Sequence, residues 1–249
     1  MERVAIQLPL PVSLPVDETF ESFVTGTDTE LVTLLQALAH AVPDWRDASL
    51  LQGLASLKLP MVTLLGSAGR GKSHLLYALC HEMADRDIPH VYLNLNNAEA
   101  WPANAFEGFE TLPLVCLDNI HAIAGNKVLE LALFDLINRV VESQQTVLVC
   151  SSRLGPSNPA FVLPDLRSRL SWGVTYQLHS LSDDARKTVV RNRATARGLR
   201  LSEQALQFLL HHSERDIPSL INLLDRLDTR SLQEQKKLSV NMVKRELGL

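Results

Sequence analysis

The chain has 249 residues, of which 46% are hydrophobic and only 5% aromatic, and 24 basic against 28 acidic side chains leave a net charge of −4. This composition is typical of a helix-rich α/β protein of one large domain or two moderate ones. The negative charge argues against a chain that holds nucleic acid alone, because neutralising phosphates needs a basic surface. Since there is no signal-peptide pattern and no apolar run of membrane-spanning length, we expect a cytoplasmic protein with no membrane partner.

The first sixteen residues differ in composition from the rest. They contain a segment in which apolar residues alternate with prolines, formed by Gln7, Leu8, Pro9, Leu10 and Pro11. Prolines at this density exclude a helix or a central strand, so we predict an extended tail over residues 1–16. Such a tail is suited to docking in an apolar groove of a partner. A disordered leader fits the same residues, and the tail alone does not decide between the two.

From residue 17 the pattern becomes that of an α/β domain. Leucines at positions 31, 34, 35 and 38 predict a first helix, and apolar runs predict strands at about 60–65, 91–95, 114–118, 146–151 and 174–178. A further helix is predicted over 127–143. Because strands that alternate with helices form parallel sheets covered on both faces, we predict a doubly wound α/β domain over residues 17–180.

The strand signals stop after residue 181. Ser182 predicts the N-cap of a helix that ends at Gly198. Another helix is expected to start at Ser202, and two more to cover 216–232 and 239–247. The sequence therefore predicts a small all-helical domain over residues 181–249.

The octapeptide at 66–73 fits the pattern G-x-x-x-x-G-K-[ST] at every position. It lies between a predicted strand and apolar residues at helical spacing, where backbone N–H groups at a helix N-terminus attract phosphate. Lys72 is expected to reach the terminal phosphates, and Ser73 to ligate Mg²⁺. The predicted nucleotide-binding residues of this region are Gly66, Ser67, Ala68, Gly69, Arg70, Gly71, Lys72, Ser73 and His74.

Polar residues follow two of the predicted strands. Asp118 stands where P-loop enzymes place the carboxylate that holds Mg²⁺, so we assign it to the metal together with Ser73. Its neighbour Asn119 is an amide, which can orient a water molecule but cannot accept its proton, so efficient hydrolysis is not expected. Ser152 is a candidate sensor of the γ-phosphate, although a strand-ending turn explains it equally well.

Two other residue sets have simpler explanations. A lone arginine such as Arg169 is most often a surface residue; its functional alternative is a finger that reaches a neighbouring subunit's nucleotide. Cys80, Cys116 and Cys150 lack metal-ligand spacing, and we interpret them as small core residues.

Together these motifs resemble the AAA+ family of bacterial initiators, DnaA and its regulatory relatives. The resemblance rests on residues 17–23, the loop at 66–73, residues 117–120 and residues 163–173. It implies that Thr19, Phe20 and Phe23 line the adenine pocket, and that ADP or ATP is bound with Mg²⁺. Relatives often carry a nucleotide-contacting arginine at the start of a lid helix; here Pro218 occupies that position, with Arg215 nearby. Segment 43–59 is longer than usual, and no role is assigned to it.

The resemblance also implies a function. DnaA continues into a helix-turn-helix DNA-binding domain, for which this chain has no room, and the segment from Gln7 to Pro11 matches a motif that binds the β sliding clamp. The expected protein is a negative regulator of replication initiation. It would contact DNA only through the clamp, and Arg169 would stimulate ATP hydrolysis by DnaA.

Two alternatives remain open. The first is a self-assembling AAA+ ATPase or helicase loader that acts on single-stranded DNA, which predicts turnover by the isolated protein. The second is an interaction module that senses nucleotide and never serves hydrolysis. A homo-oligomer is compatible with each of them, because AAA+ domains assemble when a nucleotide or a partner arrives.

Overall fold

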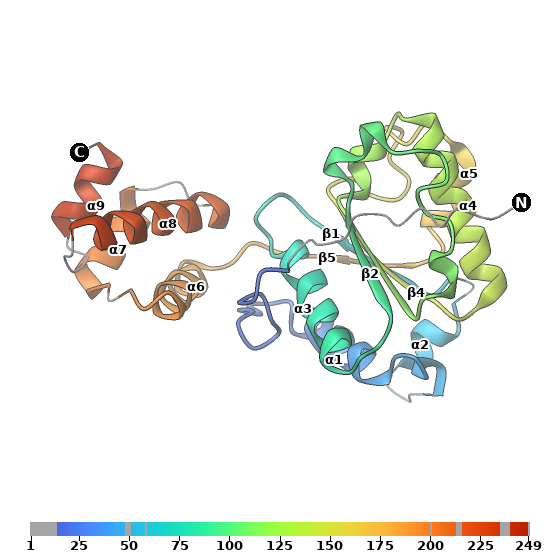
Figure 1. Ribbon diagram of the computed structural model, residues 1–249, viewed down its shortest axis with the longest axis horizontal. Coiled ribbons are helices and arrows are strands. Elements are labelled where there is room, and N and C mark those ends of the chain that lie inside the picture. The colour runs from blue at the N-terminus through green and yellow to red at the C-terminus, as the bar shows by residue number, and fades with distance from the viewer. Residues whose placement is uncertain are drawn as a thin grey trace, which may run out of the picture.

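The computed structural model describes residues 14–47, 51–57, 59–199, 201–212, 216–234 and 240–248. The segment from Gln7 to Pro11 therefore lies outside the described residues. The described chain forms a parallel sheet covered by helices, followed by a separate group of helices at one end of the molecule (Figure 1). This arrangement confirms the predicted fold class. No helix within the described ranges has the length and apolar character needed to cross a membrane.

The sheet has five parallel strands in the order β2-β3-β4-β1-β5. Their bounds are β1 Met61–Leu65, β2 His90–Asn94, β3 Leu114–Asp118, β4 Val147–Ser152 and β5 Val174–Gln177. Each lies within one residue of its predicted range. In register, Leu65 pairs with Ser152 and Asn94 with Asp118, so the polar ends of neighbouring strands meet at one edge. Parallel strands thus gather there the residues that are separated along the chain.

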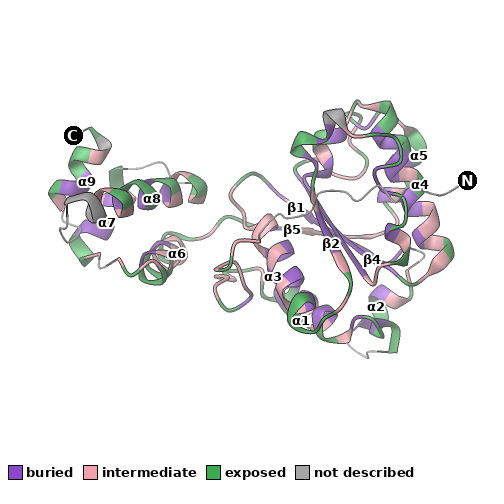
Figure 2. Cartoon of the chain, viewed as in Figure 1, coloured by how far each residue is buried: buried purple, intermediate pink, exposed green. Residues whose placement is uncertain are grey.

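Alternating side chains of the strands divide the core into two layers. In β3, Leu114 and Cys116 belong to the cluster under α1 (Thr29–Ala41) and α3 (Lys72–Asp85). Val115 and Leu117 belong to the cluster under α4 (Lys127–Ser143) and α5 (Pro164–Leu170). This alternation follows from the two-residue period of a strand, and Figure 2 shows the strands buried between the helices. All three cysteines are buried in these layers, as expected for core residues, and burial raises the pKa of Cys150 to about 12.

Five α-helices belong to the sheet domain in the described residues. They are α1 Thr29–Ala41, α2 Gln52–Ala55, α3 Lys72–Asp85, α4 Lys127–Ser143 and α5 Pro164–Leu170. The bounds of α4 were predicted correctly, and Asn126 caps it by accepting from the amides of residues 128 and 129. By contrast, α5 and α2 were not predicted, because helices of seven and four residues are too short to show periodicity.

The long segment at 43–59 contributes to the core. Trp45, Leu51 and Leu54 are buried in the same cluster as α1 and α3. Residues 48–50 and 58 lie outside the described ranges. The insertion therefore extends the apolar layer on one face of the sheet, which is a packing role.

The C-terminal helices are α6 Asp183–Ala196, α7 Glu203–His212, α8 Ile217–Glu234 and α9 Val240–Leu247. The hydroxyl of Ser182 accepts from the amide of Ala185 at 3.2 Å, which confirms the predicted N-cap of α6. These helices pack around their own apolar cluster, which extends from Val190 to Val243.

Gly173, just before β5, offers a test of the sheet's packing. A Cβ at this position would lie 2.7 Å from the carbonyl oxygen of Met61, a backbone atom that cannot move independently of β1. We expect Gly173→Ala to lower the free energy of unfolding by about 1–3 kcal/mol, measured by urea denaturation. Gly155→Ala is the matched control, since a Cβ there meets nothing within 4 Å. Equal stability of the two variants would contradict this packing.

Candidate functional site

The loop at 66–73 joins β1 to α3 in the geometry that phosphate binding requires. Gly69 and Gly71 have φ values of +72° and +83°, which side chains other than glycine rarely adopt. Gly71 lies at the N-cap of α3, so the free N–H groups of the first turn point toward the loop. The amide of Gly66 donates to the carbonyl of Ser152 at 3.1 Å, which ties the loop to β4.

Lys72 folds back over this loop. Its Nζ donates to the carbonyl oxygens of Gly66 and Ser67, each at 2.7 Å, and the side chain is buried. Burial lowers the pKa of Lys72, and the nearby carboxylate of Asp118 partly opposes this shift. The ammonium is therefore held at the loop by two neutral carbonyls. A bound phosphate would replace these bonds with stronger, charge-assisted ones.

Asp118 is the centre of a buried polar cluster. Only 1% of it is exposed, and its carboxylate accepts hydrogen bonds from three hydroxyl groups. Ser73 donates to Oδ2 at 2.7 Å, Tyr92 donates to the same oxygen at 2.8 Å, and Ser151 donates to Oδ1. The predicted pair of Ser73 and Asp118 is thus in direct contact, in the place where P-loop proteins hold Mg²⁺.

The two serines that end β4 have different roles. Ser151 bonds to Asp118 and accepts from the amide of Asn119 at 2.8 Å. Ser152, the predicted sensor, is fully buried and hydrogen-bonds within its own turn: its hydroxyl donates to the carbonyl of Leu154 at 2.6 Å and accepts from that residue's amide at 3.0 Å. The geometry of Ser152 is that of the strand-ending turn.

A cavity of about 420 Å³ lies beside the loop, between the sheet domain and the C-terminal helices. The loop and the first turn of α3 contribute residues 68–74, the end of β2 contributes Asn94, and the turn after β3 contributes Asn119. Asn119 is in the left-handed conformation and donates from Nδ2 to Oδ1 of Asn94 at 3.2 Å. Sequence analysis did not single out Asn94, because its place beside Asn119 depends on the pairing of two strands.

The segment before α1, residues 17–24, forms another wall of the cavity, but only one of its three predicted residues lines it. Phe23 lines the cavity together with Ser22 and Val24, but Thr19 and Phe20 do not. Phe20 is instead buried in the apolar layer of α1 and α3. The carbonyl of Thr19 accepts from Nε2 of His74 at 2.8 Å, and the ring of His74 contacts that of Phe23 edge to face.

The C-terminal helices close the remaining side. Val189, Asn192 and Arg193 of α6 line the cavity, and so do Ile217 and Pro218 of α8. Pro218, for which the sequence predicts the position of the lid arginine of relatives, contacts the phosphate loop, since a Cβ at Gly69 would lie 2.6 Å from its Cδ. Arg215 lies outside the described residues, so its suggested role stays a prediction. Arg193 and Arg153 are cavity cations that sequence analysis did not assign.

Arg169 is not among the residues that line this cavity. It lies on α5, away from the C-terminal helices (Figure 1). Its Nε donates to Oδ1 of Asn138 at 2.9 Å, and its guanidinium lies 4.0 Å from the ring of Trp172. No carboxylate pairs with it in the part of the chain that the structure describes.

The cavity residues fit a nucleotide with Mg²⁺. The two left-handed glycines leave no room for side chains, because a Cβ at Gly71 would lie 2.6 Å from the ring of Phe23. Free N–H groups, an ammonium and the hydroxyl–carboxylate pair of Ser73 and Asp118 supply the donors and the oxygen ligands that phosphates and Mg²⁺ require. The fold and this site define a P-loop protein of the AAA+ class.

Comparison with known families gives two matches along the chain. The bacterial DnaA ATPase domain matches residues 14–177, and the lid domain of Hda matches residues 183–247. The first match covers well over half of the sequence, and the chain belongs to the family of bacterial DnaA ATPase domains. This confirms the resemblance on which the sequence predictions rest.

Solved structures agree on the fold. Domain III of the replication initiation protein DnaA from Thermotoga maritima superposes with a TM-score of 0.74 at 18% identity, covering 96% of this chain and 98% of that one. AMPPCP-bound DnaA from Aquifex aeolicus has a TM-score of 0.65 at 18% identity, over 89% and 68% of the two chains. The Holliday junction branch migration motor RuvB from Thermotoga maritima has a TM-score of 0.63 at 17% identity, over 90% and 69%.

Gly71 allows a test of the phosphate loop. We expect Gly71→Ala to lower the affinity for a fluorescent ADP analogue about tenfold or more, because the added Cβ displaces Phe23 and distorts the first turn of α3. Fluorescence titration measures this change. In the control Gly108→Ala the same left-handed strain is introduced, with φ at +84°, but the Cβ meets nothing within 4 Å. Equal affinity of both variants for the analogue would exclude the loop as the binding site.

Proposed function

We propose that this chain is a negative regulator of DNA replication initiation, of the Hda type. It retains ADP in its own cavity, binds the DNA-loaded β sliding clamp through residues 7–11 and stimulates ATP hydrolysis by DnaA with Arg169. The matches to the DnaA ATPase domain and the Hda lid domain support a DnaA-related regulator. The particular mechanism rests on the placement of Arg169.

Arg169 has the surroundings that a finger acting on another molecule needs. An amide oxygen and two aromatic rings orient its guanidinium, and no carboxylate among the described residues pairs with it. It also lies outside this chain's own cavity. An anion brought by a partner would therefore complete the site, and charge developing on a transferring phosphoryl group is such an anion.

Hydrolysis in the chain's own cavity has weaker support. Asn119 stands next to Asp118, where a general base would act, and its side chain is already bonded to Asn94. An amide accepts no proton at neutral pH. Ser73 and Asp118 would hold Mg²⁺, which neutralises phosphate charge when bound. Without a general base at position 119, we expect the bound nucleotide to be retained and to be hydrolysed only slowly. This favours an adaptor over a self-assembling ATPase or helicase loader.

Replacing Arg169 tests the proposal directly. We expect Arg169→Ala to reduce the stimulated rate of DnaA–ATP hydrolysis roughly 10³-fold, the scale of effect known for arginine fingers. The assay contains DnaA, clamp loaded on DNA and the full chain, and it follows released phosphate. Affinity for ADP should stay unchanged, because Arg169 does not line the cavity.

Arg46→Ala is the matched control for this variant. Arg46 also lies over an indole ring, at 4.6 Å from that of Trp45, and bonds to an uncharged residue, Gln144. It should stimulate like the parent. Full stimulation by Arg169→Ala would overturn the mechanism, and rapid ATP turnover by the isolated chain would favour the alternative of an autonomous ATPase.

The clamp-binding segment is tested separately. We expect Gln7→Ala, or deletion of residues 1–11, to lower capture of the chain by immobilised clamp at least about tenfold, because short extended motifs depend on a few anchoring side chains. Affinity for ADP should be unaffected, and Ser13→Ala serves as the control within the same tail. Capture that survives the deletion would disprove the role of the tail.

A further inference from the structure

The lid, meaning residues 183–248, does not share an apolar core with the sheet domain in the described residues. The lid cluster extends from Val190 to Val243, whereas the two clusters of the sheet domain draw only on residues up to Leu178. Since no continuous hydrophobic layer joins the two parts, a few specific contacts must hold the lid over the cavity.

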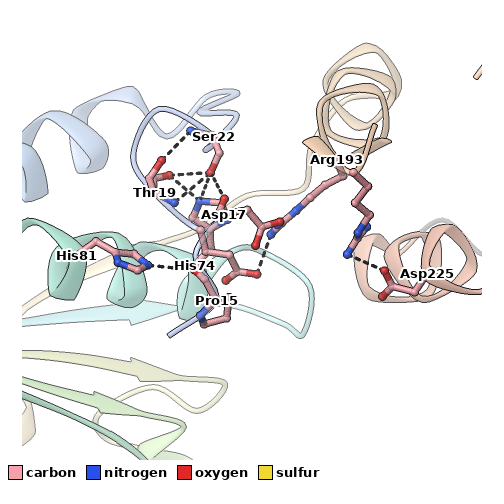
Figure 3. A network of polar contacts seen from close by, with 10 residues as sticks. Pro15, Asp17, Thr19, Ser22, His74, His81, Arg193 and Asp225 are labelled. Atoms are coloured by element: carbon pink, nitrogen blue, oxygen red, sulfur yellow. Dashed lines mark hydrogen bonds and ion pairs between the residues drawn. The ribbon is translucent and has the colours of Figure 1, made fainter. Parts of the chain in front are cut away.

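One of these contacts is an ion-pair cluster around Arg193 of α6. Its Nη1 pairs with Asp17 and its Nη2 donates to Oε1 of Glu18 at 2.7 Å. Figure 3 shows the guanidinium reaching from the lid toward Asp17. The arginine side chain is only 11% exposed, so these charged bonds are partly shielded from water. Arg193 belongs to the lid, and Asp17, 176 residues earlier, belongs to the sheet domain. This ion pair therefore joins the two parts.

Residues 15–22, the acidic segment that carries Asp17 and Glu18, are in turn hydrogen-bonded to α3. The Pro15 carbonyl accepts from Nε2 of His81 at 3.0 Å, and the hydroxyl of Ser22 donates to the Asp17 carbonyl at 2.7 Å. His74, which directly follows Ser73 of the phosphate loop, donates to the carbonyl of Thr19. Arg193 is thus connected through a short hydrogen-bonded segment to the helix that begins at the phosphate loop.

A second contact lies on the phosphate side of the cavity, where Pro218 packs against Gly69. The Pro218 contact is apolar and small, whereas the Arg193 contact is charged and joins a mostly buried guanidinium to the half-exposed Asp17 and to Glu18. Asp17, Glu18, Gly69, Arg193 and Pro218 all line the cavity, so the two contacts lie on its walls. Arg193 and Pro218 of the lid thus form part of the wall around the space that a nucleotide would occupy.

We propose that Arg193 is a latch that holds α6 against Asp17 and Glu18 and sets how long a nucleoside diphosphate or triphosphate stays bound. This inference rests on the proposed function in one respect, the occupation of the cavity by nucleotide. Arg193 acts as a positioning residue.

The test is the rate at which a fluorescent ADP analogue leaves the full-length chain when excess ADP is added. Arg193→Gln removes both charged bonds and should speed release about tenfold or more. Arg193→Lys, which keeps the charge but not the two-pronged geometry, should release at an intermediate rate. Arg191→Gln is the matched control: Arg191 lies on the same helix but pairs with Glu203 inside the lid, and its release rate should equal that of the parent.

A double-mutant cycle separates the latch from a general structural effect. Asp17→Asn combined with Glu18→Gln removes the partners from the opposite side and should accelerate release as much as Arg193→Gln, while the thermal midpoint of the nucleotide-free chain stays the same. All three changes together should add little, because they break one interaction. Additive effects, or release from Arg193→Gln at the parental rate, would overturn the latch. Failure of the parent to bind the analogue would instead overturn the proposed function.

Discussion

The buried carboxylate of Asp118 is the group on which the site depends. At 1% exposure it would be costly to bury without hydrogen bonds, and three hydroxyls satisfy it. They come from α3, β2 and β4, through Ser73, Tyr92 and Ser151. One acceptor therefore aligns the helix that follows the phosphate loop with three strands of the sheet. Ser73 and Asp118 are also the residues that would ligate a Mg²⁺ ion. The same two side chains therefore align the site and would hold the metal.

The cavity beside this cluster is closed by parts of the molecule that have separate cores. The sheet domain supplies the phosphate loop and the acidic segment, and the lid supplies Arg193 and Pro218. Because these contacts are few, lid position and nucleotide occupancy should be thermodynamically linked, and each should stabilise the other. Charged bonds between lid and sheet domain would favour retention of a bound nucleotide. Asn119 would favour it too, because an amide next to Asp118 cannot act as the general base for hydrolysis.

In the proposed function, Arg169 provides a second surface on α5, apart from the cavity. The cavity would hold this chain's own nucleotide, whereas α5 presents an oriented guanidinium without a carboxylate partner in the described ranges. The buried carboxylate of Glu130 supports this surface. It accepts from the amides of Val162 and Leu163 at 3.0 and 2.7 Å, immediately before α5 begins. The arginine is thus presented by a short helix whose start is anchored to α4.

The sequence by itself determined the strand pattern, the phosphate loop, the predicted pair of Ser73 and Asp118, and the helical lid. These features depend on periodicity and motifs within short windows, where local geometry decides the outcome. Only the tertiary structure decided that Phe20 belongs to the core, that Ser151 and not Ser152 contacts Asp118, and that Arg193 meets Asp17. Adjacent strand residues face opposite ways, and a pairing across 176 residues exists only when sheet and lid are in place. Such contacts have no local signal in the chain.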